Sequence, residues 1–158
     1  MGGDVMIRQD FTLTNGWHVR VYCLVTAVDD GVILRDLEKI GCEEDTAYEI
    51  RRNIAADKEN FGFTYSNTDI DEAIMVIGIA SSAKEFFNTL IHEIGHLTRH
   101  ISKSEGFDPY GEEEQYLQGE IAMEVYPIVS DFLCEDCRVR ACSDVRGYQL
   151  FSDVFKFM

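Results

Sequence analysis

The segment His92-Glu93-Ile94-Gly95-His96 holds two histidines four residues apart, with a glutamate directly after the first. On a helix, side chains four residues apart lie one turn apart on the same face, so both imidazoles can turn a ring nitrogen toward one ion. Glu93 lies one step round the helix, where a carboxylate can hold a water molecule and take its proton. The spacing therefore predicts a Zn²⁺ site, with His92 and His96 as ligands and Glu93 as general base.

The residues on either side of this motif predict the helix that it requires. Ser81 or Ser82 is a suitable N-cap, and Glu85 lies three residues after Ser82, as in a capping box. Apolar residues then recur every three or four positions, at Phe86, Leu90, Ile94 and Leu97. Gly106 is a suitable end. A surface helix with two unrelated histidines is the alternative, but two of the four histidines in the chain fall at this one spacing.

A catalytic zinc site usually has three protein ligands and one position open to water, so a further ligand is expected. His100 lies one more turn along the same helix, too far from an ion held by the first two histidines. We expect it to be a surface or supporting residue. The next predicted helix begins with Glu112, Glu113 and Glu114. An acidic first turn also complements the helix dipole, which explains one or two of them without a metal.

The periodicity of that second helix separates the three glutamates. Glu113 falls on the acidic stripe expected to face solvent. Glu112 lies off this stripe, in line with Gly119, which would let the two helices approach closely. Glu114 lies on the apolar side, which is equally unusual for an acid. Helix geometry thus favours Glu112 or Glu114 over Glu113.

The elements that must position the motif follow from turn residues and periodicity. Asn15-Gly16 between two stretches rich in β-formers predicts a hairpin, and the first ten residues look frayed. The segment 72–80 is nearly all apolar and β-branched, as in a strand covered on both faces. Before the motif helix we also expect a helix at 32–40, a largely exposed helix from Asp45 or Thr46 to about Lys58, and a strand within 60–67. After it we expect a helix from 112 to about 133 that is kinked or split at Pro127. The aromatic tail 138–158 is expected to form a short docked helix.

These elements predict an α+β fold in which a short mixed or antiparallel sheet packs on the motif helix and on a second long helix. The chain has 158 residues, of which 46% are hydrophobic and 27% charged, which suits one domain with a real core. We find no linker, repeat or low-complexity segment, so a single domain over residues 1–158 is expected.

Composition also bounds the partners. The net charge of -15 would repel a phosphate backbone, so nucleic-acid binding is not expected. No stretch approaches the ~20 apolar residues that a membrane span requires. The N-terminus lacks a basic segment followed by an apolar run, so we expect no signal peptide and a cytoplasmic location. Nothing in the sequence indicates the oligomeric state.

The five cysteines are an odd number in a chain that is not a small secreted scaffold, so a disulfide framework is not expected. Cys134 and Cys137 with Cys142 could hold a second, structural metal, but no fourth ligand has the right spacing. Ordinary reduced thiols are the favoured interpretation. A purely structural metal protein built on these cysteines is the competing hypothesis.

The order of strand, motif helix, loop and glutamate-bearing helix resembles the gluzincin metallopeptidases, and more closely the small ImmA/IrrE-type and phage-encoded zinc peptidase-like proteins. The resemblance covers residues 72–133. In the second helix it rests on Glu112 with an aromatic residue, Tyr116, four residues later. It implies a zincin-like domain with Glu112 as third zinc ligand. Gln115 stands where a small residue is common, and the run of three glutamates leaves Glu113 and Glu114 open.

Two functions follow from the motif and the resemblance. The first is a zinc metallopeptidase acting on a peptide or protein, in which Glu93 takes the proton of water and passes it to the leaving amine. If strand 72–80 lies at an edge, it would pair with an extended substrate. Tyr110 and Tyr116 are candidates for stabilising the oxyanion. The alternative is a zincin-fold binding or regulatory protein of phage or mobile-element origin with little or no hydrolytic activity.

Overall fold

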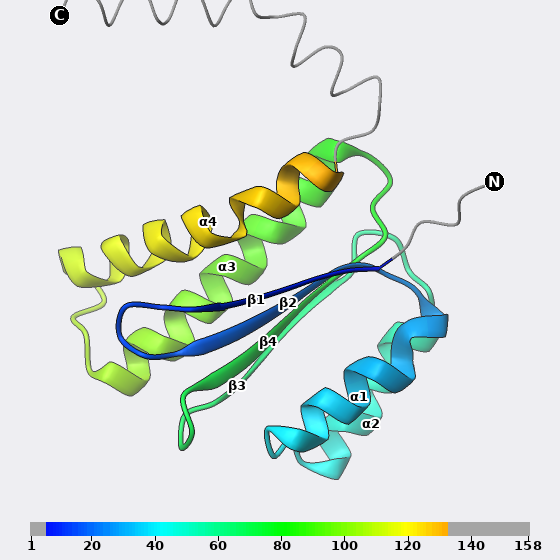
Figure 1. The fold of residues 1–158 in the computed structure, drawn as a ribbon, viewed down its shortest axis with the longest axis horizontal. Coiled ribbons are helices and arrows are strands. Elements are labelled where there is room, and N and C mark those ends of the chain that lie inside the picture. The colour runs from blue at the N-terminus through cyan, green and yellow to red at the C-terminus, as the bar shows by residue number, and fades with distance from the viewer. Residues whose placement is uncertain (1–5, 133–158) are drawn as a thin grey trace, which may run out of the picture.

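The structure, a computed structural model, describes residues 6–132. Its elements are β1 (Ile7–Thr12), β2 (His18–Val25), a 3-10 turn (Ala27–Asp29), α1 (Asp30–Lys39), α2 (Glu44–Ala55), β3 (Gly62–Asn67), β4 (Glu72–Gly78), α3 (Ala83–Glu105) and α4 (Glu112–Phe132). A four-stranded sheet lies between the α1–α2 pair on one face and the α3–α4 pair on the other (Figure 1). This arrangement confirms the predicted α+β class, with a short mixed sheet packed on the motif helix and a second long helix.

The strand order is β1-β2-β4-β3. β1 and β2 form an antiparallel hairpin, β2 and β4 are parallel, and β3 pairs antiparallel with β4. β4 is therefore central, which corrects the conditional expectation that the segment 72–80 forms an edge. The edge next to β4 is β3. This matters for the site because a free strand edge carries unpaired backbone groups.

β4 is buried on both faces, as its sequence predicts. Ala73, Met75 and Ile77 pack in the core beneath α3 and α4. The alternate residues Ile74 and Val76 pack in a second core with α1 and α2. Because successive side chains of a strand point to opposite faces, a strand between two helical layers has to be apolar at every position.

The hairpin forms at the predicted Asn15-Gly16 turn, where Gly16 has a φ of +93°, but its strands are longer than expected. The residues 7–10, expected to be frayed, pair with β2 in register. Their polar side chains have partners that the sequence does not reveal: Asp10 lies 2.6 Å from Arg20, and Gln9 donates to the carbonyl of Glu124 at 2.7 Å. Tertiary partners therefore order a segment that lacks an apolar pattern.

The predicted helices 32–40 and 45–58 correspond to α1 and α2, and in α2 only Ile50 and Ile54 are buried. α4 is one continuous helix with Pro127 inside it, so it is not split. No helix within the described part of the chain is long and apolar enough to span a membrane. The predicted tail helix at 138–158 and the three cysteines at 134, 137 and 142 lie outside the described residues, while Cys23 and Cys42 are free thiols.

The motif helix α3 begins and ends as predicted. The Ser82 hydroxyl accepts a hydrogen bond from the Glu85 amide at 3.1 Å, and Gly106 takes the left-handed conformation with a φ of +73°. One face of α3 packs on the sheet through Phe86, Leu90, Ile94, Leu97 and Ile101. The opposite face is left for the two histidines.

Candidate metal centre

His92 and His96 lie one turn apart on the exposed face of α3. Their Nε2 atoms are 3.0 Å apart, and the ring centroids are 4.7 Å apart with the planes at 79°. Both side chains are exposed, so an ion or a substrate can reach them from solvent. The local sequence dictates this placement, since the apolar spacing turns the other side of the helix to the core.

The distance between the two ring nitrogens fits a shared zinc ion. Two histidine ligands at about 2.05 Å from a tetrahedral zinc have nitrogens roughly 3.3 Å apart, close to the 3.0 Å seen here. A hydrogen bond between the rings would also fit this distance, provided that one ring carries its proton on Nε2. The donor set itself, two imidazoles and a carboxylate, is one that zinc commonly takes.

Glu93 lies beneath the two histidines, with only 3% of its surface exposed. His92, Glu93 and His96 each offer one ligand atom, and these atoms lie within 4.8 Å of one another. The hydroxyl of Thr64 donates to Glu93 Oε2 at 2.8 Å. The Thr64 hydroxyl thus contacts one oxygen of the Glu93 carboxylate, Oε2, and does not contact the other, Oε1.

Gly62 and Thr64 were not identified from the sequence, yet both shape the surroundings of Glu93. A Cβ on Gly62 would lie 2.8 Å from Thr89 Cγ2 and 3.0 Å from both Cγ and Oε1 of Glu93. Only glycine leaves room for the carboxylate at this point of the edge strand. The available signal was the run Gly62, Thr64, Ser66, in which alternate residues of one strand are small, but the register of β3 against α3 is a tertiary property.

The structure does not bring the three glutamates of α4 into this group. Glu112 and Glu113 are exposed in the first turn of α4, while Glu114 is buried with its Oε1 3.5 Å from Nη1 of Arg99. Gly119 is exposed, and a Cβ there would meet nothing within 4 Å. The prediction that Gly119 lets α4 approach α3 closely was therefore wrong. The assignment of Glu112 as a ligand is no longer supported by its alignment with Gly119. The third ligand stays a prediction.

His100 occupies the supporting position that the sequence indicates. Its ring is half-buried, and Nδ1 lies 2.8 Å from the Ser66 hydroxyl oxygen. Burial, with the nearby charges of His96 and Lys103, lowers the pKa of His100, which favours the neutral ring. Tyr110 and Tyr116, the candidates for oxyanion stabilisation, are 97% and 74% exposed. In this structure their side chains face solvent.

Two cavities lie along the seam between α3 and β3. One, of about 310 Å³, is lined by Gly62, Asn88, His92 and Glu93 among others. The second, of about 380 Å³, is lined by Ser66, Thr68, His100, Lys103 and Ser104. The candidate metal ligands thus stand beside a seam with room for side chains of a bound chain.

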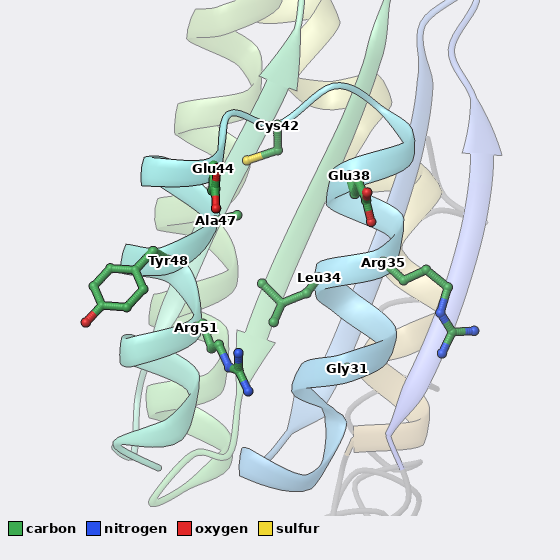
Figure 2. Close-up of a pocket in the computed structure, with 9 residues that line it drawn as sticks. All are labelled: Gly31, Leu34, Arg35, Glu38, Cys42, Glu44, Ala47, Tyr48 and Arg51. Carbon is green, nitrogen blue, oxygen red and sulfur yellow. The ribbon is translucent and has the colours of Figure 1, made fainter.

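A larger cavity of about 760 Å³ lies between α1 and α2, on the opposite face of the sheet (Figure 2). Leu34 points from α1 toward α2, whereas Arg35 and Tyr48 point away from the groove. Its lining mixes acids and bases and contains no histidine. It therefore has no part in the candidate metal centre.

Comparison of the chain with family models, with curated proteins and with solved structures finds no significant match. The resemblance to the ImmA/IrrE-type proteins therefore rests on the motif and on the order of the elements alone.

Proposed function

We infer that this protein is a zinc-dependent metallopeptidase of the zincin type, a hydrolase that cleaves peptide bonds with Glu93 as general base. One observation carries the proposal: one ligand atom from each of two exposed histidines and from the buried Glu93 carboxylate lie within 4.8 Å of one another. The relationship to the ImmA/IrrE-type and phage-encoded proteins and the cytoplasmic location belong to this proposal and rest on sequence.

His92 and His96 would hold the ion through Nε2, which requires each ring to carry its proton on Nδ1. When bound, zinc would supply Lewis-acid chemistry, polarising a carbonyl and making a water molecule acidic near neutral pH. Glu93 Oε1 would take the proton of the attacking water and pass it to the leaving amine. The hydrogen bond from the Thr64 hydroxyl fixes Oε2, so the carboxylate keeps its orientation while Oε1 would accept and release the proton.

The substrate would be an extended peptide, because β3 is an edge strand of the sheet that residues 6–132 form, and it lies beside the histidine-bearing helix. Strand addition to such an edge uses backbone hydrogen bonds for affinity and leaves side chains to fill pockets on the flanking surface. The two cavities along the seam between β3 and α3 are of the size that side chains need.

One observation favours the alternative, a zincin-fold binding or regulatory protein with little hydrolysis. Glu93 is itself a member of the group of three potential ligands. If its carboxylate completed the metal site, no base would remain beside it to activate water. The role of Glu93, base or ligand, therefore separates the two functions.

The test measures zinc content and hydrolysis of fluorescein-labelled casein for the wild type, His92→Ala/His96→Ala and Glu93→Gln, with His18→Ala as a control. His18 lies on β2 and interacts with Asp10 and Thr12, away from the motif. We expect about one zinc per chain, lost in the double variant and kept in His18→Ala. Glu93→Gln should keep zinc and lose at least about a hundredfold in hydrolysis.

Zinc retained by the double variant would place the metal elsewhere, for example on the cysteines, and would remove the basis of the proposal. Zinc lost from Glu93→Gln, together with a wild type that does not cleave casein, would establish the binding protein instead.

A further inference from the structure

The cavity of about 380 Å³ at the end of the seam between α3 and β3 has an unusual lining. Its residues all carry hydrogen-bond donors, namely Ser66, Thr68, His100, Lys103 and Ser104. None of them is acidic, although the chain has 29 acidic residues against 14 basic ones. The three other cavities described for residues 6–132 each include a carboxylate in their lining.

Lys103 is the charged group of this cavity. It is exposed near the end of α3, and none of the ion pairs found within residues 6–132 involves it. Lys39, by contrast, contacts Asp36 at 3.1 Å. The ammonium group of Lys103 is thus available for a carboxylate from outside the described part of the chain.

Ser66 and His100 add a second donor whichever proton arrangement holds. If Nδ1 of His100 accepts the Ser66 hydroxyl hydrogen at 2.8 Å, then Nε2 carries the remaining proton and can donate it. If Nδ1 donates to Ser66 instead, the Ser66 hydroxyl hydrogen is free to donate. A carboxylate in the cavity would therefore find one charged and one neutral donor.

The cavity lies one step along the seam from the candidate metal centre. The rings of His96 and His100 have centroids 6.3 Å apart. On the strand side, Ser66 is two residues beyond Thr64, which is about 7 Å in a strand. An extended peptide at the metal centre would therefore place the side chain of a residue about two positions from the scissile bond in this cavity.

We propose that this cavity, defined by Ser66, Thr68, His100, Lys103 and Ser104, is a specificity subsite that accepts the carboxylate of an aspartate or glutamate side chain in an extended peptide substrate. The proposal rests on the proposed peptidase function. The overall charge of -15 acts against any acidic ligand, but salt screens charges beyond about 8 Å under physiological conditions. The local donors then decide what binds.

The experiment uses capped hexa-alanine peptides in which one position, taken in turn, is Glu or its neutral counterpart Gln. Binding is followed by chemical-shift titration of the full-length Glu93→Gln protein, so that no cleavage intervenes. The best Glu peptide should bind about two- to fivefold more tightly than its Gln partner, the range expected for an exposed ion pair. The difference should shrink as salt is added.

Two variants of Lys103 test the contact, and one variant of Lys84 is the matched control. Lys103→Gln should abolish the preference for Glu, and Lys103→Glu should reverse it, so that the Gln peptide binds more tightly than the Glu peptide. Lys84→Gln, which removes the same charge from the exposed start of α3, should leave the preference unchanged. That control separates a local contact from the general field of the protein.

Equal affinity for the Glu and Gln peptides, absence of binding by either, or an unchanged preference in Lys103→Gln would overturn the subsite. Binding of inorganic phosphate without binding of the peptides would show a pocket for free anions, and would also overturn it. Cleavage by the wild type is measured separately on the same peptides. Absence of cleavage would count against the peptidase, whereas the affinity ratio alone decides the subsite.

Discussion

Thr64 on the edge strand β3 donates its hydroxyl hydrogen to Oε2 of Glu93, 2.8 Å away on helix α3. The strand that would bind a peptide backbone is therefore also the element that holds the candidate base. Glu93 is only 3% exposed, and its carboxylate needs such a partner because an unpaired buried charge is costly. If the proposed function holds, this relationship would link substrate binding and proton transfer through one side chain.

Replacing Thr64 by Val keeps the shape of the side chain and removes the hydroxyl, whereas Thr64→Ser keeps the hydroxyl. We expect Thr64→Val to lower kcat by about tenfold with KM little changed, because the base loses its orientation and the substrate edge is intact. Thr64→Ser should restore most of the activity. Equal loss in both variants, or a change confined to KM, would contradict a positioning role.

Gly62→Ala tests the close approach of β3 to Glu93. The added Cβ would lie 2.8 Å from Thr89 Cγ2 and 3.0 Å from the Glu93 carboxylate, so both side chains must shift. We expect a loss of about 1–3 kcal/mol in the free energy of unfolding and reduced hydrolysis with zinc retained. Gly119→Ala is the control, since its Cβ meets nothing within 4 Å and alanine favours a helix. A destabilised Gly119→Ala with an unaffected Gly62→Ala would reverse this interpretation.

The resemblance to ImmA/IrrE-type proteins predicts that Glu112→Ala weakens zinc binding, by about tenfold or more as expected for a ligand. Glu113 is exposed, so Glu113→Ala should leave both zinc affinity and stability unchanged. Glu114→Ala removes the partner of Arg99, so we expect it to lower the melting temperature while zinc remains bound. Zinc affinity and thermal unfolding of the three variants decide the assignment. If Glu114→Ala alone loses zinc, the third ligand is Glu114.

A separate prediction concerns the buried pair of Tyr22 and Asp36. The Tyr22 hydroxyl donates to Asp36 Oδ2, and burial together with this bond raises the pKa of Tyr22 to about 12. The folded pKa lies above the unfolded value of about 10. The contribution of the Tyr22 hydroxyl to the free energy of unfolding is therefore complete below pH 10 and is lost as the pH rises toward 12.

Tyr22→Phe should therefore cost about 1.5 kcal/mol in the free energy of unfolding at pH 8, the value of a hydrogen bond to a charged group. The difference in the free energy of unfolding between wild type and Tyr22→Phe should decrease as the pH rises from 10 to 12. Urea unfolding at pH 8 and pH 11 measures both. A gap that stays constant with pH would show that the hydroxyl does not titrate as described.

The sequence by itself determined the local features of the site. Ser82, the apolar spacing and Gly106 define α3, and a helix of this pattern necessarily turns His92 and His96 outward together. The unbroken apolar run at 72–80 likewise determined a strand buried on both faces, because every one of its side chains needs an apolar neighbour. Such properties depend on residues close in sequence.

Only the tertiary structure decided what lies beside the motif. Strand order made β3, not β4, the edge, and the register of β3 against α3 brought Thr64 and Gly62 to Glu93. The packing of α4 placed Glu114 beside Arg99 and left Gly119 exposed. The helical periodicity of the sequence predicts neither result. The hydrogen bond between β3 and α3 joins residues 29 positions apart, and the one between α3 and α4 joins residues 15 positions apart. A pattern of period two or 3.6 identifies the face a residue lies on, but not the element that packs there.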